Sequence, residues 1–158
     1  MTQTTAAKED RGSDPRELLK AGLFLLQRSQ PREAMRALEE ASRLDPESPL
    51  IQSYLGLAMA TARTGTKEAV QLCEQAVRGD AFQPELYLNL GRVYMIVGDK
   101  RRARLAFLEG LKLDREDPDL LRSLQVIGMR KLPPLPFLHR DSPVNKYLGI
   151  ALRRLRLR

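Results

Sequence analysis

Small, apolar and proline positions recur along the chain at a fixed spacing, and no stretch shows the two-residue alternation typical of a half-buried β-strand. Prolines stand at positions 15, 49, 84 and 118, which are 34, 35 and 34 residues apart. Each follows a residue that can cap a helix or lie just before one, such as Asp14 and Asp117. Proline suits the first helical position because no hydrogen bond is lost there and its backbone angle is preset. The spacing therefore predicts four helices that start at regular intervals.

Other markers keep the same interval. Glycines stand at 22, 56 and 91, alanines at 34, 69 and 103, and small residues at 41, 76 and 110. The first glycine interval is 34 but the first alanine interval is 35, so one extra residue lies between Gly56 and Ala69. Every later marker is displaced by this one residue. A period of this length is typical of arrays built from repeated supersecondary units.

These markers resemble the tetratricopeptide repeat, in which a large residue, a Leu-Gly-like pair and an aromatic residue occupy the first helix of each unit. Two small residues and a bulky one occupy the second helix, and Asp-Pro follows. The third unit matches best, with Pro84, Tyr87, Leu90, Gly91, Tyr94, Gly98, Ala103, Phe107, Gly110 and Asp114. Departures are Met59 and Cys73 in the second unit and Arg115 at the last proline position. The resemblance covers about residues 15 to 131.

The resemblance implies an all-α fold, a superhelical array of antiparallel helix pairs with about 3.5 repeats. We expect repeats at 15–48, 49–83 and 84–117, followed by a capping helix at 118–131, because stacked units bury their faces only against neighbours. Residues 1–14 are polar and mixed in charge and are expected to form a disordered N-terminal segment. A proline-rich linker at 132–141 and a basic amphipathic helix at 142–158 complete the expected layout.

The net charge of +7 comes entirely from the end of the chain. Residues 1–128 hold 19 basic and 19 acidic side chains, whereas residues 129–158 hold eight basic side chains and one acid, Asp141. In the expected C-terminal helix, Val144, Tyr147, Leu148 and Leu152 share one face with other apolar residues. The basic surface of this tail comprises Lys146, Arg153, Arg154, Arg156 and Arg158.

Three hypotheses account for this tail. Its apolar stripe docks on the domain itself, since folded chains usually bury such stripes, or the tail engages an acidic protein partner. In the third hypothesis it lies on an anionic membrane surface or touches nucleic acid. Nucleic acid is the weakest alternative because aromatic side chains for base stacking are scarce.

The residue inventory predicts no catalytic site, no metal site and no cofactor. His139 is the only histidine and is interpreted as a loop residue near a helix start. Cys73, the only cysteine, stands at a position that the repeat buries, so we expect a small core hydrophobe rather than a reactive thiol. A single cysteine carries no mark of an oxidising compartment, and we found neither a signal peptide nor a membrane span. These features predict a cytoplasmic protein, with peripheral contact at the inner membrane face if the tail binds lipid.

The resemblance also implies a binding groove, because the first helices of successive units line a concave face. The positions projected onto this face are Leu19, Leu23, Tyr54, Leu57, Leu88, Asn89, Arg92, Met95, Arg122 and Val126. Relatives that grip the carboxyl terminus of heat-shock chaperones use Lys and Asn side chains, whereas the corresponding residues here are Leu19, Leu23, Tyr54, Glu85 and Asn89. A mostly aliphatic face favours an amphipathic helix or an extended apolar peptide as ligand.

The sequence therefore predicts a non-catalytic adaptor or assembly scaffold that binds a protein or peptide. Two alternatives remain open: a small chaperone of a secretion or export system, which has three such repeats and an apolar groove, and a membrane-associated adaptor that uses the basic tail. The bound partner and the oligomeric state do not follow from the sequence. Part of the apolar stripe can also serve only to pack helix against helix.

Replacing Ala103 by leucine tests the packing role assigned to the small residues. Helices approach closely only where side chains are short, so the larger side chain should destabilise the fold by roughly 1 to 3 kcal/mol. A thermal melt followed by circular dichroism should show a lower midpoint for Ala103→Leu. An unchanged midpoint would contradict the assignment.

Overall fold

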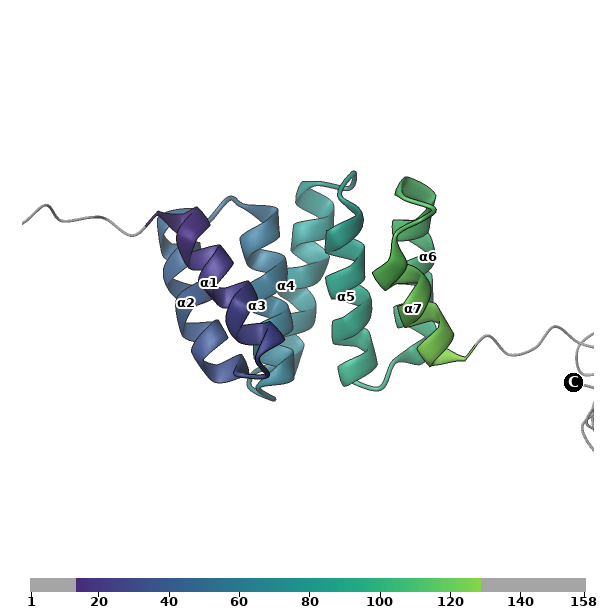
Figure 1. The fold of residues 1–158 in the computed structure, drawn as a ribbon, viewed down its shortest axis with the longest axis horizontal. Helices are drawn as coiled ribbons and strands as arrows, with labels where there is room; N and C mark the ends of the chain where they lie inside the picture. The colour runs from purple at the N-terminus through teal and green to yellow at the C-terminus, as the bar shows by residue number, and fades with distance from the viewer. Residues whose placement is uncertain (1–13, 129–158) are drawn as a thin grey trace, which may run out of the picture. The chain divides into compact units, whose positions relative to one another are not determined.

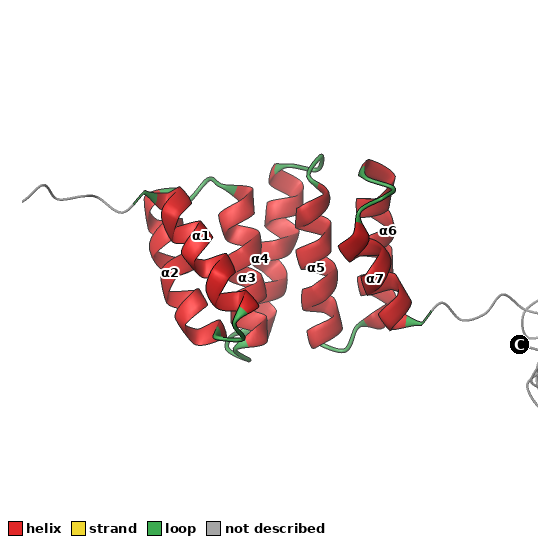
Figure 2. Cartoon of the chain, viewed as in Figure 1, coloured by secondary structure: helices red, strands yellow, loops and turns green. Residues whose placement is uncertain are grey.

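The computed structural model describes residues 14–128, and every regular element in that range is a helix (Figure 2). The helices are α1 (Pro15–Gln27), α2 (Pro31–Leu44), α3 (Pro49–Thr61), α4 (Thr66–Gly79), α5 (Pro84–Ile96), α6 (Lys100–Leu113) and α7 (Pro118–Ile127). The expected linker and basic C-terminal helix, and the expected N-terminal segment apart from Asp14, lie outside the described residues. The capping helix is present as α7, but it ends at Ile127, before Gly128 with a left-handed φ of 75°, rather than at the expected Lys131.

The helices form three consecutive pairs, α1/α2, α3/α4 and α5/α6, arranged in chain order (Figure 1). The chain divides into two compact units, Met1–Leu124 and Gln125–Arg158, and all three pairs belong to the first unit. Within it, the first helices contact one another, α1 with α3 and α3 with α5. Helices α2 and α4 each pack against the first helix of their own pair and the first helix of the next. The result is a layer of first helices backed by a layer of second helices.

Proline and acidic residues start several of these helices. The Asp14 carboxylate accepts a hydrogen bond of 2.9 Å from Arg16 N, and Asp117 Oδ1 accepts from the backbone amides of Asp119 and Leu120. Ser48 differs from the expectation, because its side chain forms no capping hydrogen bond before Pro49. An acidic or proline start still satisfies or removes amides that the helix itself leaves unpaired.

The extra residue inferred from the spacing lies in the turn between α3 and α4. The turns inside the first and third pairs span residues 28–30 and 97–99, whereas the turn inside the second pair spans residues 62–65. All three turns contain a left-handed residue, Ser29, Arg63 and Gly98, with φ of 58°, 58° and 86°. The longer turn adds a second one, Gly65, at φ 60°. The insertion is thus absorbed in a connection and leaves both helices intact.

One close contact recurs in all three pairs. A Cβ atom built on Gly22 would lie 2.6 Å from Leu38 Cγ, and one built on Gly56 would lie 2.6 Å from Cys73 Sγ. Gly91 faces the ring of Phe107 in the same way, and a Cβ there would collide with three ring carbons. Each glycine therefore lets a bulky residue of the second helix pack directly against the backbone of the first.

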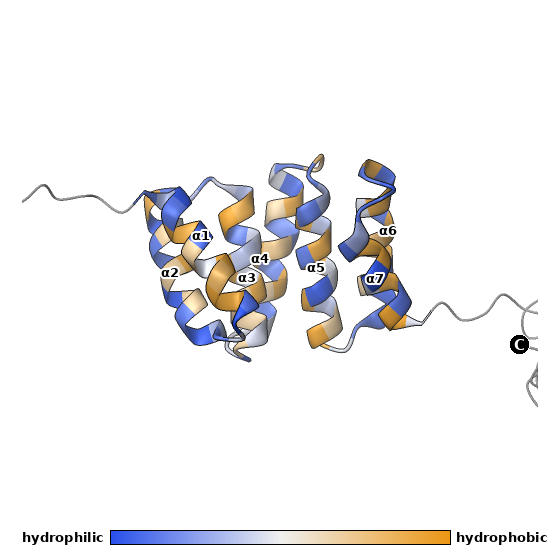
Figure 3. Ribbon diagram, in the orientation of Figure 1, coloured by the Kyte–Doolittle hydropathy of each residue, from blue (hydrophilic) through white to orange (hydrophobic). Residues whose placement is uncertain are grey.

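The core is richest around the middle of the array. Eight of the thirteen residues of α3 are buried, because α3 has neighbours on several sides, whereas Gly22 is the only buried residue of α1. Hydrophobic residues occur along each helix and are interleaved with hydrophilic ones (Figure 3). Phe24 remains 55% exposed on α1, and Phe82 is 84% exposed in the turn before α5. Helix α3, in the central pair, is thus the most extensively buried of the described helices.

Gly91→Ala tests the recurrent glycine contact. The added methyl group meets the ring of Phe107, so we expect a loss of roughly 1 to 3 kcal/mol in the free energy of unfolding, measured by chemical denaturation. Gly79→Ala is the matched control, since a Cβ there meets nothing closer than 3.4 Å and helix propensity favours alanine. Equal stability of the two variants would show that Phe107 does not require the glycine.

Candidate functional site

The residues projected onto the inner face come from the layer of first helices, but they differ in exposure. Leu19, Leu23, Arg92 and Met95 are half-buried, and Arg122 is exposed. By contrast, side chains from α3 and α5 are buried: Tyr54 and Leu57 are each 8% exposed, Leu88 is 6% exposed and Asn89 is fully buried. Val126, the last of the set, belongs to the second compact unit and is 72% exposed. The accessible apolar part of this face is therefore narrower than the sequence predicted.

Direct packing of α3 on α5 explains this burial. Helices α3 and α5 contact each other directly, and Leu57 of α3 and Leu88 of α5 are part of the hydrophobic core. Helix α1 contacts α3 less extensively, and so Leu19 and Leu23 keep part of their surface free. Some of the projected residues thus hold the repeats together, while the others form the surface that a ligand can reach.

A buried polar pair joins α3 to α5 inside this contact. Asn89 Nδ2 donates a hydrogen bond of 3.0 Å to Ser53 Oγ, and both side chains are fully buried. Asn89 Oδ1 is also buried and has no hydrogen-bond partner among the described residues. Ser53 was not in the predicted set, because its role depends on a partner 36 positions away. A buried acceptor without a partner costs free energy and marks a place where a donor would be favourable.

A second interaction between the same helices lies beside the first. The Tyr54 hydroxyl donates a hydrogen bond to Glu85 Oε1. Burial raises the pKa of Tyr54 above its ordinary value, and the bond to Glu85 adds to this rise. The Asn89 amide and the charge of Arg92 act on this pKa in the opposite direction. Glu85 itself is exposed.

The two basic residues predicted in the groove share one acid. Arg92 Nη2 lies 3.4 Å from Asp119 Oδ2, and Arg122 Nη1 donates a hydrogen bond of 3.0 Å to Asp119 Oδ1. All three side chains are partly exposed, so these pairs contribute little stability. They do offset much of the positive charge at the start of α7, which leaves this end of the face without a strong cationic site.

Two models of the tetratricopeptide repeat family match the chain, over residues 19–84 and 84–117. Together they cover the three helix pairs. The chain belongs to the tetratricopeptide repeat (TPR) family. Domains of this family are typically protein-interaction modules.

Known TPR proteins support this assignment. The chain is 31% identical over 114 residues to the TPR repeat-containing thioredoxin TTL4 of Arabidopsis thaliana, a match that spans 72% of this chain but only 17% of that protein. The first TPR domain of Spaghetti (RPAP3), bound to the HSP90 peptide SRMEEVD, shares 16% identity and superposes with a TM-score of 0.60 over 73% of this chain and 91% of that one. The Sgt2 TPR domain of Aspergillus fumigatus gives 18% identity and a TM-score of 0.62 over 72% and 76%. These structural similarities concern the fold alone.

A separate polar cluster ties α4, α5 and α6 of the TPR domain together. The Tyr94 hydroxyl donates a hydrogen bond of 2.6 Å to Glu74 Oε1, and the Arg102 guanidinium lies 4.7 Å from the centre of the Tyr94 ring. Burial, and then the bond to Glu74, raises the pKa of Tyr94 to about 12. Arg102 is itself held by Asp99, at 2.6 Å from Nε to Oδ2. This cluster has a clear structural role in joining consecutive repeats.

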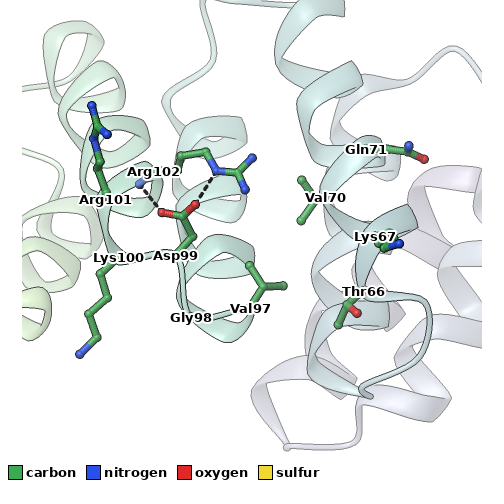
Figure 4. Close-up of a pocket in the computed structure, with 10 residues that line it drawn as sticks. All are labelled: Thr66, Lys67, Val70, Gln71, Val97, Gly98, Asp99, Lys100, Arg101 and Arg102. Carbon is green, nitrogen blue, oxygen red and sulfur yellow. Dashed lines mark hydrogen bonds and ion pairs between the residues drawn. The ribbon is translucent and has the colours of Figure 1, made fainter.

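An open hollow of about 810 Å³ lies beside this cluster, between α4 and the start of α6 (Figure 4). Val70 and Val97 face it from opposite sides, whereas Lys100 and Arg101 extend to the side of Asp99 away from Val70. None of the residues projected onto the inner face lines this hollow. It is a shallow surface depression outside the predicted site.

Two kinds of site are absent from residues 14–128, metal-binding groups and membrane-spanning helices. No group of three or more His, Cys, Asp or Glu side chains within residues 14–128 could hold a metal ion. In the same range, the longest helix has 14 residues, and none is long and apolar enough to cross a membrane. His139 and the basic tail residues, Lys146, Arg153, Arg154, Arg156 and Arg158, lie outside the described residues, so the hypotheses about them remain predictions.

Cys73 has the buried position that the sequence predicted. Its side chain is fully buried against Gly56, its thiol donates to Ser53 O at 3.4 Å, and burial raises its pKa to about 12. The thiol therefore stays protonated at a pH of about 8, where an ordinary cysteine is partly ionised.

Because Cys73 is buried, the rate at which its thiol reacts reports how often the helix pair α3/α4 opens. In native buffer at a pH of about 8, reaction with an aromatic disulfide reagent should be about a hundredfold slower than in denaturing guanidinium chloride, because the thiolate forms only when the pair α3/α4 opens. Absorbance of the released thiol measures the rate. Rapid, complete labelling of the native protein would contradict the buried position.

Proposed function

We propose that this TPR protein is a non-catalytic adaptor or assembly scaffold that binds an apolar peptide or an amphipathic helix on its inner face. The observation that carries the proposal is the half-exposed aliphatic surface of Leu19, Leu23 and Met95 on the layer of first helices. Aliphatic side chains that remain accessible beside a well-packed core favour a ligand with an apolar stripe.

The ligand class differs from the acidic peptides of two structural neighbours. The RPAP3 domains were solved with the HSP90 peptide SRMEEVD and the HSP70 peptide SGPTIEEVD. At the positions that hold carboxylates in such chaperone-binding relatives, this chain has Leu19, Leu23, Tyr54, Glu85 and Asn89. Leucine side chains offer no hydrogen bond, and the negative charge of Glu85 repels a carboxylate. We therefore infer a ligand that is not recognised through an acidic carboxyl terminus.

The site that we propose comprises the accessible residues Leu19, Leu23, Arg92, Met95 and Arg122 together with the buried residues that support them. Val126 stays in the proposal as an exposed apolar residue, without a defined position relative to the others. A cytoplasmic location is part of the same proposal, in line with the single buried cysteine. The basic tail at 142–158 is proposed to add a second contact, either to an acidic protein or to an anionic membrane.

Leu23→Lys tests the inner face. The probe is a fluorescein-labelled amphipathic peptide of about four helical turns, with leucine and alanine on one face and glutamine on the other. A lysine at position 23 removes apolar contact area, so we expect fluorescence anisotropy to show binding about tenfold weaker than for the unaltered chain.

Leu105→Lys is the matched control, because Leu105 is 53% exposed on α6 in the layer of second helices. This variant should bind the peptide as the unaltered chain does. The proposal fails if the unaltered chain binds no such peptide, or if Leu105→Lys weakens binding as much as Leu23→Lys does.

A further inference from the structure

The inner face carries hydrogen-bond acceptors that no donor within residues 14–128 satisfies. Glu85 and Asn89 lie one helical turn apart on α5 and therefore share a face of that helix. Glu85 is exposed, and no lysine or arginine of the described chain lies within ion-pairing distance of it. Asn89 Oδ1 is fully buried and lacks a donor within residues 14–128. Within the described residues, the charge of Glu85 is thus not paired with a cation, and Asn89 Oδ1 is not paired with a hydrogen-bond donor.

Tyr54 connects the two acceptors. Its hydroxyl uses its one hydrogen to donate to Glu85 Oε1, so the phenolic oxygen is left with acceptor capacity only. Asn89 lies one turn after Glu85 on α5, and its amide nitrogen already donates at 3.0 Å to Oγ of Ser53, the residue before Tyr54. The second carboxylate oxygen of Glu85 and the Tyr54 oxygen are thus two acceptors at one place, next to the buried pair of Ser53 and Asn89 that joins α3 to α5.

Arg92, a cation on the same helix as Glu85, is already paired with another acid. Arg92, two turns after Glu85 on α5, pairs with Asp119 of α7 at 3.4 Å, and Asp119 also binds Arg122. Arg92 therefore does not neutralise Glu85. A cationic group from outside would meet an unpaired carboxylate together with an uncharged acceptor, which is the arrangement that an ammonium or guanidinium group requires.

We propose that Glu85, Tyr54 and Asn89 form a recognition site for the side chain of a lysine or arginine in the bound peptide. This inference rests on the proposed function and specifies its ligand: an apolar peptide or amphipathic helix with a basic residue beside its apolar stripe. Glu85 supplies the charge and the Tyr54 oxygen accepts a second hydrogen bond, while the buried Asn89 holds α5 against α3 through its bond to Ser53. The aliphatic stem of the ligand residue packs on the apolar surface beside the site.

The test compares three labelled peptides that share the leucine and alanine face and differ only in one central residue beside it, lysine, glutamine or glutamate. At physiological salt the lysine peptide should bind the unaltered chain about tenfold more tightly than the glutamine peptide, and the glutamate peptide should bind most weakly. Glu85→Gln should reduce the preference for the lysine peptide over the glutamine peptide to within about twofold. Glu85→Lys should reverse the order of the lysine and glutamate peptides.

Glu39→Lys is the matched control, since Glu39 is an exposed glutamate on α2 with no ion pair within residues 14–128. It changes the net charge as Glu85→Lys does and should leave the lysine preference intact. Equal binding of all three peptides overturns the cation site but leaves the proposed function standing. Binding of none of them overturns both, and a loss of preference in Glu39→Lys assigns the effect to overall charge rather than to Glu85.

Discussion

The contact between a first-helix glycine and a bulky second-helix residue is the constraint on which the rest of the structure depends. It occurs as Gly22 with Leu38, Gly56 with Cys73 and Gly91 with Phe107. Because the side chain packs directly on helix backbone, the two helices of each pair are held close together. The close pairing lets α3 contact both α1 and α5, and the first helices then form a layer of their own. That layer supplies Leu19, Leu23, Arg92 and Met95 of the proposed binding face, and α7 supplies Arg122.

The middle of the array shows how the same contacts serve both stability and recognition. Ser53 and Asn89 join consecutive repeats by a fully buried hydrogen bond, and Tyr54 joins them again through Glu85. Polar groups at such a junction fix the register of one helix against the next only if they are satisfied. The charge of Glu85, unpaired within residues 14–128, leaves this junction incomplete, and a ligand of the proposed kind would complete it.

The fold followed from the sequence because its signals are local and periodic. The proline and glycine spacing predicted the family, the three helix pairs and the extra residue, which the structure places in the turn 62–65. The exposure of the candidate site residues could be predicted from the sequence less well than the fold. The burial of Asn89 depends on the packing of α3 against α5, because its partner Ser53 is 36 residues away in the sequence. Helical periodicity identifies the face of a residue but not whether a neighbouring helix covers it.

A methyl NMR titration of the leucine-labelled chain with the lysine-bearing peptide tests the central claim, that the layer of first helices is the binding surface. The account predicts chemical-shift changes that saturate with peptide at Leu19, Leu23 and Leu88, with little change at Leu105 and Leu108 of α6. Changes confined to Leu105 and Leu108, with α1 unaffected, would contradict it and place the binding surface on the second helices.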